Sequence, residues 1–268
     1  MADARAHEDL EVRIGELTKR FEETADAELL VRRADLPRRH REWKRSAGDL
    51  ERAAELGAPE DSVRLARAML LFDTHQDLHA IEALAGVGGV PAQFLRARAF
   101  ARLGETVKAS AAYSRAIALC AQPLPEHFIE HARMLATAEP PQIDEALGVI
   151  KLGLKRLGSI ISLNEEAFNL ERQIDPALAL ERVREVNRTA THPNPEWLLR
   201  EVELLINLDE GDQASAALAS ARAKLEALPA RRRAAPAIRE LFTRLDSLAR
   251  LLSGSVTSDL VADKVTTD

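Results

Sequence analysis

Small residues recur along this chain at a nearly constant spacing. The steps between successive members are 34, 29, 35, 35 and 35 residues. The members are Ala34, Ala68, Ala97, Ala132, Ala167 and Val202. A period of this length is the signature of an array in which one supersecondary unit is repeated and buries its core against its neighbours.

The stretch "LRARAFARLGETVKASAAYSRAIALC", residues 95–120, indicates what the unit is. Ala97 stands on a first predicted helix, and Gly104 ends it, because a left-handed residue at a helix end costs little only for Gly. Ala109 and Tyr113 fall four apart, on one face of a second helix. A small residue at a helix crossing lets the backbones approach, and a large one fills the next gap. The unit is therefore a helix, a turn and a helix.

The second helix of each unit carries a comparable pair of residues. These pairs are Ser46/Leu50, Ala80/Leu84, Ala109/Tyr113, Ala146/Ile150 and Ala179/Val183. In the sixth unit both Ala214/Leu218 and Ala216/Ser220 fit, so its register stays open. Breaks rich in Pro and Gly separate the units at 58–61, 86–91, 121–126, 138–142 and 191–196.

These features resemble the tetratricopeptide repeat (TPR), a 34-residue helix–turn–helix with a small residue followed by an aromatic one on its first helix. Ala97-x2-Phe100 and Ala109-x3-Tyr113 match that pattern, and the resemblance covers about residues 27–228. It implies an all-α, right-handed α-solenoid of five or six repeats. The second repeat is short, with "GVGGV" at its end, and Pro37 predicts that the first helix is kinked or starts late.

The two ends have the features of caps, which repeat arrays need because a terminal repeat exposes an apolar face. Residues 1–26 are expected to form an N-terminal capping helix, and 229–252 a C-terminal one. The apolar face of the latter consists of Ile238, Leu241, Leu245, Leu248 and Leu252. The same spacing also suits a self-association seam, and so a self-assembling structural protein. The polar segment 253–268 is predicted to be disordered.

A metal site is the main alternative to a binding scaffold. "FDTHQDLH" contains Asp73, His75, Asp77 and His79, and the two histidines lie four apart. A metal-binding protein or metal-dependent enzyme would use this 73–79 cluster. The repeat phase, however, places it in the turn between the helices of the second repeat, where polar residues are expected. We therefore predict no metal, no cofactor and no catalytic activity.

Composition narrows the classes of partner. The formal net charge of −6 argues against a nucleic-acid binder, although "RRR" at 231–233 is basic. No run approaches the roughly 20 apolar residues that span a membrane. The N-terminus lacks an apolar signal core, so a cytoplasmic location is expected. The expected state is a monomer or a weak homo-oligomer.

The TPR resemblance also implies a binding face, because the first helices of TPR pairs line a concave groove that usually takes peptides. Inward-facing positions lie one, four and five residues after the small residue and three before it. The predicted partner-binding residues at these positions are Phe94, Arg98, Arg102, Ile129, Arg133 and Arg172. Arginine guanidinium groups beside an apolar surface favour the binding of a protein segment that carries acidic residues and an apolar anchor.

Overall fold

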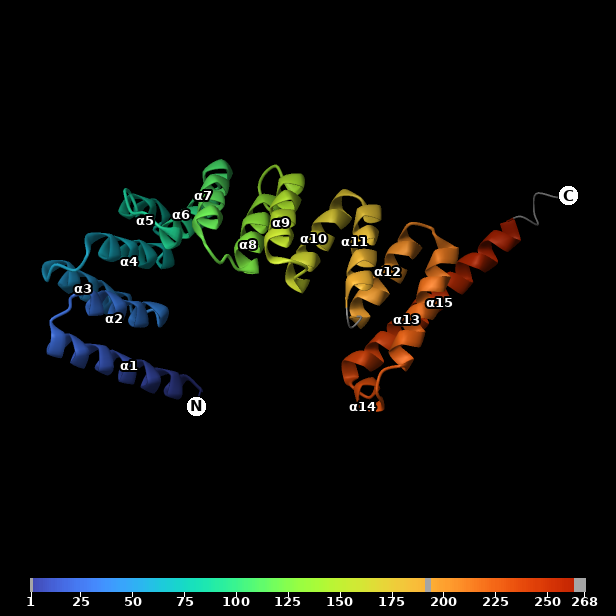
Figure 1. The fold of residues 1–268 in the computed structure, drawn as a ribbon, viewed down its shortest axis with the longest axis horizontal. Coiled ribbons are helices and arrows are strands. Elements are labelled where there is room, and N and C mark those ends of the chain that lie inside the picture. The colour runs from blue at the N-terminus through green and yellow to red at the C-terminus, as the bar shows by residue number, and fades with distance from the viewer. Residues whose placement is uncertain (1, 191–193, 263–268) are drawn as a thin grey trace. The chain divides into compact units, whose positions relative to one another are not determined.

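The computed structural model describes residues 2–190 and 194–262, and these ranges form fifteen helices and no strand (Figure 1). The helices are α1 (Ala2–Thr24), α2 (Glu28–Arg39), α3 (Trp43–Glu55), α4 (Glu60–Asp73), α5 (Asp77–Ala83), α6 (Val90–Arg102), α7 (Thr106–Leu119), α8 (Pro125–Ala136), α9 (Ile143–Leu157), α10 (Ile161–Ile174), α11 (Pro176–Thr189), α12 (Pro195–Asn207), α13 (Gly211–Glu226), α14 (Ala230–Arg233) and α15 (Pro236–Ala262). The predicted all-α fold is confirmed.

The chain divides into two compact units, residues 1–127 (unit 1) and residues 128–268 (unit 2). In unit 1 the successive pairs α2/α3, α4/α5 and α6/α7 pack together, and α1 packs on α2. In unit 2 the pairs α10/α11 and α12/α13 do the same. Helices α8 and α9 meet where the Phe128 side chain lies against Gly153. Each unit is therefore a solenoid of tandem helix pairs.

The small residues that defined the repeat lie at helix crossings. All six members, from Ala34 to Val202, are at most 1% exposed. The partner positions on the second helices, such as Ala80, Ala109 and Ala146, are fully buried as well. In the sixth repeat Ala214 is fully buried while Ala216 is exposed, which fixes the register at Ala214/Leu218.

The first two repeats depart from the regular pattern, the first by a proline and the second by its length. The short second repeat is confirmed, because α5 has only 7 residues. The late start predicted for the first helix is wrong, because α2 begins at Glu28 and contains Pro37 as a buried residue. Pro37 falls in the last turn of α2, so the hydrogen bond that it cannot donate is lost where only two helical residues follow.

The C-terminal helix α15 packs on α12 and α13. Leu241 and Leu245 are buried there against Leu199 and Leu225, so the face expected to cap the array is covered within the chain. The prediction of a disordered tail needs correction, because α15 continues to Ala262 and residues 253–262 are helical. No proline interrupts this segment, and extending an existing helix costs less than nucleating one. Residues 263–268 lie outside the described residues.

Candidate functional site

A first cleft in unit 1 runs between α2 and α4 and has a volume of about 440 Å³. Its lining combines an apolar floor with charged side chains at the edge. The lining residues from the first helices of the two pairs are Glu28, Val31, Arg32, Ala34, Asp35, Arg38, Arg39, Ser62, Leu65, Ala66 and Met69. The cleft therefore offers an apolar contact surface that is flanked mainly by arginines.

A second cleft, of about 330 Å³, lies between α4 and α6. It is lined by Arg38, Met69, Phe72, Asp73, Pro91, Phe94, Leu95, Arg98 and His127. Arg38 and Met69 line both clefts, so the two adjoin along the α2, α4 and α6 face of unit 1. We call this surface, made by the two linings together, the A-helix face.

The A-helix face contains the inward positions that the TPR resemblance implied. Val31, Leu65 and Phe94 each lie three residues before a small residue, and all three line a cleft. The residues one after the small residue, Asp35, Met69 and Arg98, line the clefts as well. The repeat therefore places equivalent side chains from three successive pairs along one face of unit 1.

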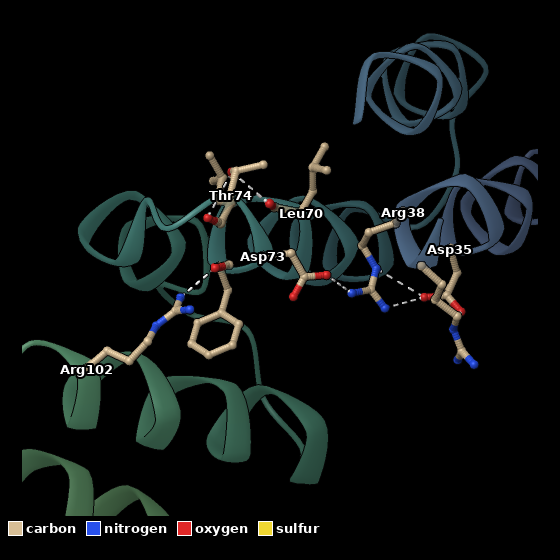
Figure 2. A network of polar contacts seen from close by, with 9 residues as sticks. Asp35, Arg38, Leu70, Asp73, Thr74 and Arg102 are labelled. Carbon is tan, nitrogen blue, oxygen red and sulfur yellow. Dashed lines mark hydrogen bonds and ion pairs between the residues drawn. The ribbon is translucent and has the colours of Figure 1, made fainter. Parts of the chain in front are cut away.

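Arg38 connects the first and second helix pairs at the junction of the two clefts (Figure 2). Its guanidinium donates to Asp35 on α2, with Nη2 2.5 Å from Oδ1, and to Asp73 on α4. Burial would lower the pKa of Arg38, but the hydrogen bonds and charges of Asp35 and Asp73 outweigh it and raise the pKa. Arg38 is thus a permanent cation that bridges two repeats.

Arg102, one of the predicted partner-binding residues, makes several contacts within unit 1. Its Nε donates to Asp77 Oδ1 at 2.8 Å and its guanidinium lies 3.4 Å from the centre of the Phe72 ring. It also donates to the carbonyl oxygen of Phe72, as Figure 2 shows. Arg102 therefore ties α6 to the end of α4 and to the start of α5.

Phe94 and Arg98 both line the second cleft, but in different ways. Phe94 is only 5% exposed, with its ring centre 4.3 Å from that of His127 and 6.3 Å from that of Tyr113. It is therefore part of the floor of the cleft. Arg98 is exposed at the edge, where it can meet a ligand.

The other predicted binding residues belong to unit 2. Ile129 is half-buried, and Arg133 donates to Glu166 Oε2 through Nη2 at 2.7 Å. That hydrogen bond is the main reason why the pKa of Arg133 is raised. Arg172 lies 5.7 Å from the centre of the Phe168 ring. The clefts of the A-helix face contain none of these three residues.

Unit 2 also contains a buried ion pair and an aromatic cluster that were not predicted from the sequence. Arg182 donates to both carboxylate oxygens of Glu171, at 2.5 and 2.6 Å, and joins α11 to α10. Arg200 packs over the rings of Phe168 and Trp197, at 4.9 and 4.7 Å from their centres. Neither contact could be predicted from the sequence, because charged residues at this helical spacing are also typical of a solvent-exposed helix face.

The carboxylates of the 73–79 cluster are paired with arginines. Asp73 pairs with Arg38 and Asp77 with Arg102, while His75 Nδ1 lies 3.4 Å from Arg102 Nη1. Among the side chains that the structure describes within residues 2–190 and 194–262, no group of three or more His, Cys, Asp or Glu is arranged to hold a metal ion. None of the helices in these ranges is long and apolar enough to cross a membrane.

Comparison with known proteins bears on the fold. No family model and no curated protein sequence matches this chain. Among solved structures, the C-terminal part of a TPR repeat-containing protein from Cytophaga hutchinsonii superposes with a TM-score of 0.57 at 15% identity, over 85% of this chain and 93% of that one. PilW, a type IV pilus biogenesis factor, gives 0.55 at 14% identity, over 70% of this chain and 89% of its own. This chain therefore has the fold of tetratricopeptide-repeat proteins.

Proposed function

We propose that this protein is a non-enzymatic scaffold that binds a segment of a partner protein on the A-helix face. The segment is extended or helical and carries an apolar anchor beside acidic residues. The observation that carries the proposal is the sharing of Met69 and Arg38 by two adjoining clefts. One continuous surface thus offers an apolar floor and cationic edges to a single ligand.

The apolar part of the proposal rests on Met69 and Phe72, which are only partly buried. Methionine adapts to irregular ligand shapes because it is unbranched and flexible, and it is common at peptide-binding surfaces. An apolar side chain of the partner seated there would displace water from both residues, which favours binding.

The charged part rests on the exposed arginines at the edges of the clefts. Arg39 is 69% exposed in its side chain and Arg98 is also exposed. Arg38 is held in place by Asp35 and Asp73, so its side chain loses little further conformational entropy when a partner binds. Exposed cations mainly accelerate association with an acidic partner, whereas contacts in the cleft determine how slowly it dissociates.

The test begins with affinity capture of partners by the full chain, followed by mapping of the bound segment and titration of a synthetic peptide of that segment. Met69→Glu puts a charge into both clefts and should weaken peptide binding at least about tenfold. Val107→Glu is the matched control, because Val107 is 80% exposed on α7 and lines neither cleft. Equal affinity of the Met69→Glu variant and the unchanged protein would contradict the proposal.

A further inference from the structure

A third cleft of unit 1, of about 780 Å³, lies beside the A-helix face at the turns of the first two helix pairs. Its lining is Arg38, Arg39, Arg41, Trp43, Asp73, Thr74 and His75. It shares Arg38 and Arg39 with the α2–α4 cleft and Asp73 with the α4–α6 cleft. The lining therefore contains three arginines and one carboxylate, in a cleft that continues the A-helix face. Two of these arginines are already in ion pairs, Arg38 with Asp35 and Asp73, and Arg39 with Asp35, where Nε lies 2.7 Å from Oδ2.

The turns that form this cleft contain an unusual backbone feature. Arg41 (φ 63°) and His75 (φ 60°) both have the left-handed conformation that L-residues seldom adopt. The equivalent turn of the third pair has Gly104 (φ 74°) and that of the sixth has Asp209 (φ 60°). All four residues lie seven positions after the small residue of their repeat.

The four turns close with the same hydrogen bond. The amide that follows the left-handed residue donates to the carbonyl five residues earlier, as from Glu42 to Pro37 and from Gln76 to Leu71. This is the pattern of a helix C-terminus for which glycine is the favoured residue. Glycine serves this purpose at Gly104, so the turn itself does not require Arg41 or His75.

We infer that Arg41, with Arg39 and His75, forms an anion subsite that takes the carboxylates of the acidic partner segment. The strained backbone occurs at two successive turns, and both side chains line the same cleft. Strain of this kind points to function when it is observed at a surface site rather than assumed. This inference rests on the proposed function, because the carboxylates belong to the segment that the A-helix face binds.

The chemistry of the lining suits a carboxylate. Arg39 and Arg41 are exposed, and a guanidinium offers its donors in a planar fork that matches the two oxygens of a carboxylate. A guanidinium has no acceptor, so Arg102 can only donate to Nδ1 of His75, and a neutral His75 ring then carries its proton on Nε2. Trp43 adds an apolar surface for the methylene groups of a glutamate.

The test uses the full chain and two fluorescein-labelled peptides. One contains a leucine between two runs of three glutamates, and the other has glutamine in place of every glutamate. Binding is measured by fluorescence anisotropy at low ionic strength, because salt screens exposed charges. The unchanged protein should bind the glutamate peptide about tenfold more tightly than the glutamine peptide.

Arg41→Gly separates binding from folding, since glycine fits the left-handed turn better than arginine. It should weaken binding of the glutamate peptide about tenfold, leave the glutamine peptide unaffected, and keep or raise the melting temperature. Asp209→Gly makes the same backbone change in unit 2 and should alter the affinity for neither peptide.

Two results would overturn the inference. One is an Arg41→Gly variant that binds the glutamate peptide as well as the unchanged protein does. The other is an unchanged protein that does not prefer the glutamate peptide to the glutamine peptide. If both peptides bind equally well and Met69→Glu weakens both, the A-helix face stands and the anion subsite alone is wrong.

Discussion

Arg41 and His75 occupy the same position in successive helix pairs, each ends its turn with a positive φ, and both line one cleft. Arg41 lies seven residues after Ala34, and His75 lies seven after Ala68. The same count from Ala97 leads to Gly104, the residue that favours such a turn. The first, second, third and sixth repeats therefore share one backbone geometry at this turn, and the first two place basic or imidazole side chains on it where the proposed binding surface begins.

Gly153 on α9 is packed too tightly for a side chain. A Cβ atom there would lie 2.9 Å from Cγ of Phe128, which is fully buried and cannot move aside. Gly153→Ala should lower the free energy of unfolding by about 1 kcal/mol, because the clash outweighs the better helix propensity of alanine.

Gly148 on the same helix provides the control. It is exposed, and a Cβ there would meet nothing within 4 Å. Gly148→Ala should therefore raise the free energy of unfolding by roughly 1 kcal/mol. Urea unfolding of both variants measures the two changes in the free energy of unfolding. A Gly153→Ala variant as stable as Gly148→Ala would show that α8 and α9 are not closely packed at Gly153.

Ala109 should not tolerate enlargement, because it is fully buried where α7 crosses its neighbour. Ala109→Leu should cost about 2 kcal/mol through overpacking. Ala111→Leu makes the same change at an exposed position of α7 and should be nearly neutral. Thermal unfolding followed by circular dichroism compares them, and equal midpoints would refute the assignment of Ala109 to a helix crossing.

A substitution at Leu245 tests whether α15 caps the array or forms a self-association seam. Leu245 is fully buried within the chain, whereas Leu251 on the same helix is 61% exposed. Leu245→Glu should cost about 3 kcal/mol, because it buries a charge among apolar residues. Leu251→Glu should leave stability unchanged. Unfolding and light scattering are measured together, and a stable Leu245→Glu variant that changes only the oligomeric state would favour the seam.

His131 should make unit 2 sensitive to acid. It is 2% exposed, and burial lowers its pKa from 6.5 to about 4. The native state therefore binds this proton less readily than the unfolded chain does. As a result, the free energy of unfolding falls as the pH falls from about 6.5 towards 4, with a loss of about 2 kcal/mol between pH 7 and pH 5.

The measurement is urea unfolding at both pH values. Trp197, which is buried in unit 2, supplies the fluorescence signal in a Trp43→Phe background. His131→Gln should remove most of the difference between the two pH values, while His40→Gln, at an exposed position, should preserve it. An unchanged pH dependence in the His131→Gln variant would mean that other groups cause the loss.

Much of the architecture followed from the spacing of small residues. Ala97 and Ala109 had to be buried if the repeat was real, because only a small residue lets two helices approach closely, and both are fully buried. The turn at Gly104 followed from the same reasoning, since its φ of 74° is one that glycine adopts readily.

The binding residues were harder to predict, because the sequence does not show which acceptors a long side chain reaches. Arg102 and Asp77 are 25 residues apart, and nothing local indicated that they pair. Phe94 lines the α4–α6 cleft, but its burial by Tyr113 and His127 depends on packing between helices. The left-handed conformation of Arg41 was within reach, because counting from Ala34 aligns it with Gly104.

Hydrogen–deuterium exchange of the full chain, with and without the captured partner segment, tests the A-helix face most directly. Amide exchange reports local opening, which a bound ligand suppresses at the surface it covers. We predict that the segment slows exchange in α2, α4 and α6 and in the turns at Arg41 and His75. Protection confined to α3, α5 and α7, or to unit 2, would contradict the proposal that the partner binds on the first helices of the repeats.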